Sequence, residues 1–161
     1  HVDAVRLSDV AAKYISITGK KINLDGDLTA DGDIAIEARD RGCPLDMACI
    51  EWSDPAPVVQ NGDIISRGGN VRILGVEQTQ TDNGTISSVG TGELRQSAGT
   101  RTKAGGDVSI NMRKVDAGYI TAGNKIDIHA GKVRLTGPLT AKVIVVPENT
   151  ENREGNLRIR K

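Results

Sequence analysis

The sequence predicts an all-β protein that coils into a β-solenoid, and three observations predict this fold class. A short phrase recurs along the chain, in which glycine and Asp or Asn precede two β-forming residues around one variable residue. Apolar and polar residues alternate inside each copy, which indicates strands with one buried face. Glycine or Asp-Gly interrupts the chain every few residues, so no long amphipathic helix is expected.

The strands are expected where two apolar residues flank one variable residue. The clearest pairs are Ile15/Ile17, Ile22/Leu24, Ile34/Ile36, Val71/Ile73, Val108/Ile110, Ile126/Ile128 and Val133/Leu135. Residues 14–161 are predicted to form one solenoid domain. Residues 1–13 are predicted to be an N-terminal cap or an exchange segment, although Val2 to Lys13 can also be read as a helix.

The spacing of the phrase predicts the size of one coil. Ile34 to Val71 and Val71 to Val108 each span 37 residues, and Val108 to Ile126 spans 18. We therefore expect coils of about 18 to 19 residues, with one coil hidden inside each longer interval, and eight or nine coils in all. The phrase is lost at 39–60 and 76–101, which are predicted excursions. A β-sandwich is the alternative fold.

Composition excludes several classes of function. The chain has 161 residues, with 21 basic and 21 acidic side chains. The zero net charge argues against binding to nucleic acid or to anionic membranes, both of which need a basic excess. The longest apolar run, residues 143–146, is too short to span a bilayer, so no membrane insertion is expected. Aromatic residues make up 2% of the chain, so small aliphatic side chains must fill the core.

Three segments, 32–38, 103–110 and 120–130, are similar to repeats of the filamentous haemagglutinin family. These segments read GDIAIEA, KAGGDVSI and ITAGNKIDIHA. The family consists of large exoproteins that Gram-negative bacteria export by two-partner secretion. The resemblance implies a right-handed parallel β-helix with repeats near 19 residues, export to the cell surface, and adhesion. It supplies no catalytic residues, and the family's N-terminal secretion domain is not visible here.

The two cysteines, Cys43 and Cys49, lie six positions apart within the first excursion. We expect a disulfide that closes a small loop in an oxidising compartment. Two free thiols and a metal site are the alternatives, and the metal site lacks further ligands because the chain has only two histidines. The same excursion holds Trp52, a possible contact for a partner or a carbohydrate. The alternative is that Trp52 folds back and covers the side of the coil.

The acidic segment Asp25, Asp27, Asp31 and Asp33 invites a calcium hypothesis, because calcium prefers several carboxylate oxygens. The segment does not fit the EF-hand spacing, and Asp next to Gly is also typical of tight turns. Turns are therefore the favoured interpretation, and no metal or cofactor is expected. His129 is expected to face solvent.

These observations predict a non-enzymatic, extracellular or cell-surface bacterial protein that is a β-helical shaft segment of a secreted adhesin. Its partner would be a ligand on a host or neighbouring cell. An alternative is a subunit that stacks or exchanges strands end to end into a filament. A second alternative is a carbohydrate-active β-helix enzyme, for which Asp33 and Asp107 would line one edge. Since the chain starts at His1, we expect a processed product or part of a longer protein.

Overall fold

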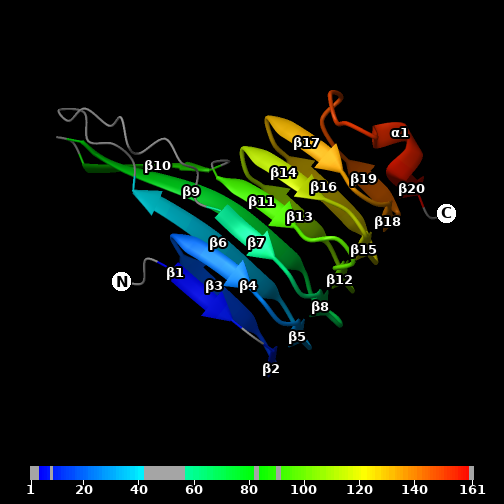
Figure 1. The fold of residues 1–161 in the computed structure, drawn as a ribbon, viewed down its shortest axis with the longest axis horizontal. Coiled ribbons are helices and arrows are strands. Elements are labelled where there is room, and N and C mark those ends of the chain that lie inside the picture. The colour runs from blue at the N-terminus through cyan, green and yellow to red at the C-terminus, as the bar shows by residue number, and fades with distance from the viewer. Residues whose placement is uncertain (1–3, 8, 42–56, 82–83, 90–91, 160–161) are drawn as a thin grey trace.

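The chain forms a right-handed parallel β-helix in a computed structural model (Figure 1). The structure describes all residues except 1–3, 8, 42–56, 82–83, 90–91 and 160–161. Three parallel sheets run along the solenoid, and successive strands along the chain pass from one sheet to the next. The predicted fold class is confirmed, and the parallel pairing excludes the alternative β-sandwich.

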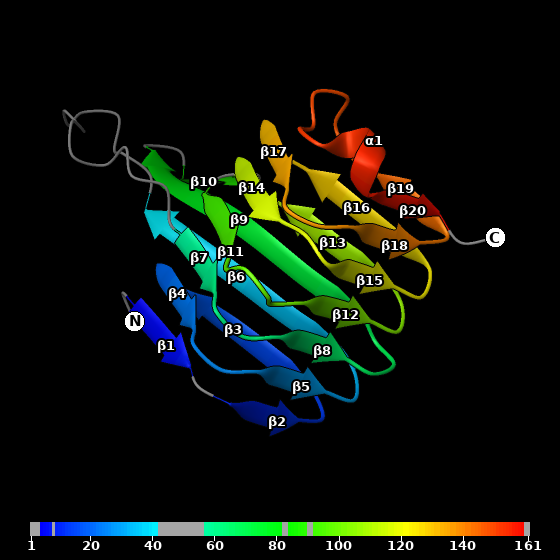
Figure 2. The ribbon, with the colours of Figure 1, turned by 45° about the vertical axis from the view of Figure 1, so that its right-hand side comes forward.

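Through the six complete coils, each sheet takes every third strand of the shaft (Figure 2). The first sheet consists of β1 (Ala4–Leu7), β4 (Lys21–Leu24), β7 (Pro57–Gln60), β11 (Glu93–Gln96), β14 (Lys114–Ala117) and β17 (Lys132–Leu135). The second consists of β2 (Val10–Ala12), β5 (Leu28–Ala30), β8 (Ile64–Ser66), β12 (Thr102–Ala104), β15 (Ile120–Ala122), β18 (Leu139–Ala141) and β20 (Leu157–Ile159). The shaft strands of the third sheet are β3 (Ile15–Gly19), β6 (Ile34–Arg41), β9 (Val71–Thr81), β13 (Val108–Asn111), β16 (Lys125–His129) and β19 (Val143–Val145), and one further strand pairs with β9 outside this path.

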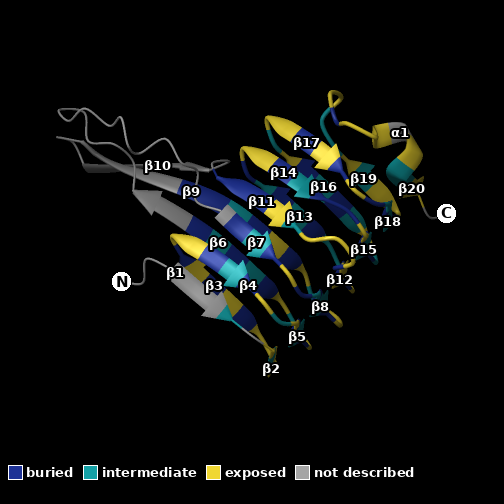
Figure 3. Ribbon diagram, viewed as in Figure 1, coloured by how far each residue is buried: buried dark blue, intermediate teal, exposed yellow. Residues whose placement is uncertain are grey.

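The core is a set of stacked aliphatic columns inside the three sheets. Figure 3 shows buried residues recurring along the strands of all three sheets. In the third sheet, Ile34, Val71, Val108 and Ile126 lie opposite one another in successive coils and are almost completely buried. The strands show the alternating burial that the sequence predicts, for example in β17 and β16. Each inward residue is covered by its own coil and by its two neighbours, so residues without large rings can fill the narrow interior.

The described strands make six coils and the start of a seventh, which corrects the expected eight or nine. Val71 pairs directly with Ile34 and with Val108, although each pair is 37 residues apart. No coil is hidden in either interval. Each interval contains one coil and one insertion of similar length, and spacing alone cannot separate these two cases. Uninterrupted coils have the expected size, since Ile126 pairs with Val108 18 residues before it.

The second excursion contains a β-hairpin in place of the expected coil. β9 continues beyond the shaft, where β10 (Gly84–Val89) pairs with it antiparallel. β6 is also extended and pairs with β9 as far as Arg41 and Gln78. These three strands form an arm beyond the shaft (Figure 1). After this hairpin, the chain rejoins the first sheet of the shaft at β11.

The two ends of the shaft differ. Within residues 1–13, expected as a cap, exchange segment or helix, Ala4–Leu7 and Val10–Ala12 form β1 and β2 of the first coil. At the other end, β17 forms a bridge to Glu151, which precedes the short helix α1 (Arg153–Asn156). β20 then pairs with β18 and continues the second sheet. Among the described residues, no helix has the length and apolar character needed to cross a membrane.

Candidate functional site

Polar turn residues connect successive coils through a column of hydrogen bonds that we call the Asp33 ladder. The ladder consists of Asp33, Asn70, Asp107 and Asn124. The backbone amide of Asn70 donates to Oδ1 of Asp33 at 2.8 Å, and the amide of Asp107 donates to Oδ1 of Asn70 at 2.8 Å. Asn124 Nδ2 donates to Oδ1 of Asp107 at 2.9 Å. A Cβ on Gly69 would lie 2.5 Å from Oδ1 of Asp33, so the recurring glycine makes room for the preceding coil's side chain.

A second column, the Asp63 ladder, follows the same rule at another corner. Oδ1 of Asp9 accepts from the amide of Asp27, and Oδ1 of Asp27 accepts from the amide of Asp63, each at 2.8 Å. Oδ1 of Asp63 accepts from the amide of Arg101 at 2.9 Å. The aspartates of these turns therefore accept hydrogen bonds from backbone amides of the neighbouring coil. The sequence interpretation expected them to stabilise only the turn in which they lie.

The four aspartates of the calcium hypothesis are not brought together. Asp25 and Asp27 lie in the turn before β5, and Asp31 and Asp33 lie in the turn after it. Asp25 accepts from Asn61 at 3.1 Å, and Asp31 forms an exposed ion pair with Arg67 at 3.4 Å. Within the described part of the chain, no three His, Cys, Asp or Glu side chains are grouped to hold a metal ion.

The outer face of the third sheet carries a groove that crosses three coils. The groove has a volume of about 310 Å³. Its lining comes from β6, β9, β13 and the turns before them, and consists of Asp33, Ile34, Ala35, Asn70, Val71, Arg72, Asp107 and Ser109. We call it the β6–β13 groove. One wall is the Asp33 ladder, and the other contains the outward residues Ala35, Arg72 and Ser109, which lie in register.

Tyr14 lies one coil before the N-terminal end of the β6–β13 groove and does not itself line the groove. Ile15 of the first coil pairs with Ile34 of the second, so Tyr14 lies beside Asp33 of the next coil. The residue is 65% exposed, and a Cβ on Gly32 would overlap its ring, so the ring rests on that glycine. The sequence interpretation did not assign Tyr14 to a site. The sequence did hold one signal. Tyr14 directly precedes the apolar pair Ile15/Ile17, in the same position that Asp33 holds before Ile34/Ile36.

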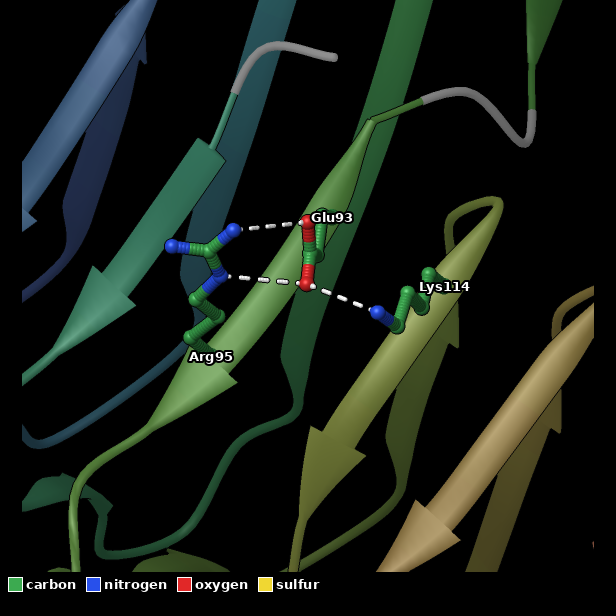
Figure 4. Close-up of polar contacts among 3 residues, drawn as sticks. All are labelled: Glu93, Arg95 and Lys114. Carbon is green, nitrogen blue, oxygen red and sulfur yellow. Dashed lines mark hydrogen bonds and ion pairs between the residues drawn. The ribbon is translucent and has the colours of Figure 1, made fainter. Parts of the chain in front are cut away.

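The first sheet carries an ion-pair cluster on its outer face (Figure 4). Glu93 is buried, and Arg95 donates to it through Nε at 3.0 Å and Nη2 at 3.2 Å. Lys114 Nζ lies 3.6 Å from the same carboxylate. The hydrogen bond from Arg95 and the two positive charges hold the pKa of Glu93 below its usual value, although burial opposes the shift. One carboxylate with two cations is a typical structural ion pair.

Other predicted residues have the following positions. His129 is exposed, as expected, and its Nε2 lies 3.1 Å from Oδ1 of Asp127. Asp33 and Asp107 do lie along one edge, with Asn70 between them. Cys43, Cys49 and Trp52 lie outside the described residues, so the disulfide and the role of Trp52 stay predictions.

Comparisons with protein-family models, with curated proteins and with solved structures found no match to this chain.

Proposed function

We propose that this chain is a non-enzymatic, extracellular structural and adhesive protein, a stiff β-helical shaft segment of a secreted bacterial surface adhesin. The observation that carries the proposal is the continuous bonding between coils. Each of the six complete coils is joined to its complete neighbours by three strand pairs, and the turn ladders add hydrogen bonds at two corners. The repeats similar to those of the filamentous haemagglutinin family support the same proposal.

Such a shaft resists bending and local opening for a physical reason. In a solenoid, stability is the sum of terms within each coil and between neighbouring coils. Here the terms between coils include buried aliphatic columns, and the two polar ladders add hydrogen bonds at two of the three corners of the described shaft. A rigid, unreactive spacer between a cell and a surface ligand needs these properties.

A filament subunit is the second candidate, and one observation favours it. Among the described strands, β19 and β20 are the last of their sheets toward the C-terminal side, and Val143, Val145 and Ile159 in them are exposed. Unpaired strand edges can pair with another chain. Successive copies stacked in register would continue all three sheets.

The first test separates these two candidates. Sedimentation velocity and negative-stain electron microscopy would be run over a concentration series, and beads coated with the protein would be washed over cell monolayers. A shaft segment gives one small species at all concentrations and retains the beads. Filaments that lengthen with concentration would replace the shaft by the filament subunit. Retention no greater than that of albumin-coated beads would overturn the adhesive role.

A further inference from the structure

We propose that the β6–β13 groove binds an extended chain of uncharged sugar units, with the ring of Tyr14 stacking against a sugar at the N-terminal end. This inference rests on the adhesive part of the proposed function and names the class of ligand. It is independent of whether the shaft forms filaments.

The shape of the groove fits a linear polymer. The groove runs along the solenoid axis, because its lining residues come from matching positions in three successive coils. Coils stack at about 4.8 Å, which is similar to the length of one sugar unit in an extended chain. Equivalent residues of successive coils can therefore meet equivalent hydroxyls of successive sugars. The volume of about 310 Å³ is at the small end for ligand pockets, so the chain would continue along the surface.

The polar residues of the groove match hydroxyl groups, which both donate and accept hydrogen bonds. Asp33 and Asp107 supply acceptors, Arg72 supplies donors, and Asn70 and Ser109 supply both. The hydrogen bonds given above for the two aspartates all end on Oδ1, so Oδ2 of each is the oxygen to meet a ligand. The ladder holds these carboxylates in place before a ligand arrives, which lowers the entropic cost of binding.

Tyr14 adds an apolar surface to this polar groove. The C–H groups on one face of a sugar pack on an aromatic ring, and an exposed tyrosine beside a row of hydrogen-bonding groups supplies such a platform. Lys13 Nζ lies over the ring at 5.9 Å from its centroid, and this long, flexible side chain would move aside for a stacked sugar. Tyr14 and the groove come from adjacent coils, so one ligand can contact both.

Charge selects the kind of glycan. The groove lining contains two carboxylates and one guanidinium, from Asp33, Asp107 and Arg72. Two carboxylates repel a sulfated or uronic-acid polymer, and one arginine does not compensate for both. The lining therefore favours a neutral glycan.

The test uses four hexasaccharide probes at millimolar concentrations in titration calorimetry. Three are neutral, built of β-1,4-glucose, α-1,4-glucose or β-1,4-N-acetylglucosamine, and the fourth is a heparin hexasaccharide. The first variant is Ala35→Trp, which fills the groove from an outward position and leaves the core unchanged. Thr121→Trp is the matched control, because Thr121 faces outward from the second sheet. Ser109→Trp replaces the first variant if that protein does not fold.

We expect at least one neutral probe to bind. Ala35→Trp and Tyr14→Ala should each weaken that binding about tenfold or more, whereas Tyr14→Phe and Thr121→Trp should change it less than about twofold. Binding of heparin alone, binding of no probe, or equal binding by wild type and Ala35→Trp would overturn the inference. Failure here leaves bead retention and sedimentation unchanged, so it is distinguishable from failure of the shaft proposal.

Discussion

Removal of one carboxylate from the Asp63 ladder should destabilise the shaft. The replacement Asp63→Ala removes the oxygen that accepts a hydrogen bond of 2.9 Å from the Arg101 amide. The hydrogen bond from the backbone amide of residue 63 to Asp27 is kept. One hydrogen bond contributes about 1 kcal/mol, and a charged acceptor contributes up to about 3. Because Asp63 is half-buried, we expect a loss of about 1–2 kcal/mol, or about 2–8 °C in Tm.

The variant Asp63→Asn separates the hydrogen bond from the charge. Asparagine keeps Oδ1 as an acceptor, as Asn70 does in the other ladder. It also removes the repulsion between the carboxylates of residues 63 and 27 in neighbouring coils. For two unit charges separated by the strand spacing of about 4.8 Å, this repulsion is about 0.9 kcal/mol in water and less in salt. The neutral asparagine oxygen is a weaker acceptor for the Arg101 amide than the carboxylate, and this loss opposes the gain. Asp63→Asn should therefore lie within about 0.5 kcal/mol of wild type.

Urea unfolding followed by circular dichroism measures these changes. The control is Asp31→Ala, which removes only an exposed ion pair at 3.4 Å and should cost less than about 0.5 kcal/mol. If Asp63→Ala is no less stable than Asp31→Ala, the turn ladders do not stabilise the shaft. If Asp63→Asn is as unstable as Asp63→Ala, the charge of Asp63 is what matters, and the hydrogen-bond account is wrong.

Three other changes test separate features. Gly62→Ala should destabilise by about 1–3 kcal/mol because its Cβ would overlap the backbone of the preceding coil, whereas Gly155→Ala, in α1 with open space around it, should leave Tm unchanged or raise it. Glu93 has a lowered pKa in the folded state, so its contribution is present above the unfolded pKa of about 4.3 and is lost as the pH falls through the folded value. Glu93→Gln should therefore flatten the acid limb of a Tm–pH profile, and an unchanged limb would contradict the ion-pair account. Intact mass after alkylation without reductant should show no adduct at Cys43 or Cys49 if they form the predicted disulfide, and two adducts if they are free.

The sequence predicts the fold class because each strand carries its own signal. Alternation in pairs such as Ile126/Ile128 is a property of single strands, and the recurring Gly-Asp turn gives their spacing. The predicted number of coils was wrong because a separation of 37 residues between two copies of the phrase fits two different arrangements. One coil plus an insertion has the same length as two coils, and only the direct pairing of Val71 with Ile34 and Val108 decides between them.

The candidate site was accessible from the sequence only in part. The equivalence of Asp33, Asn70 and Asp107 was visible, but the hydrogen bonds between coils were not, because they depend on the direction in which each side chain leaves its turn. Tyr14 was recognisable only as an aromatic residue, since its place beside Asp33 follows from the pairing of Ile15 with Ile34.

The corner between the third and first sheets has a consequence for protein engineering. The connections at this corner differ widely in length. One residue connects β3 to β4, and two residues connect β13 to β14 and β16 to β17. The connection from β6 to β7 has 15 residues. The pairing registers on both sides of the long connection are kept, as in Ile22 with Val58 and Ile34 with Val71. The entropic cost of closing a loop grows slowly with its length. Foreign peptides inserted after β13 or β16 should therefore be displayed along one side of the rod, at intervals set by the stacking of the coils.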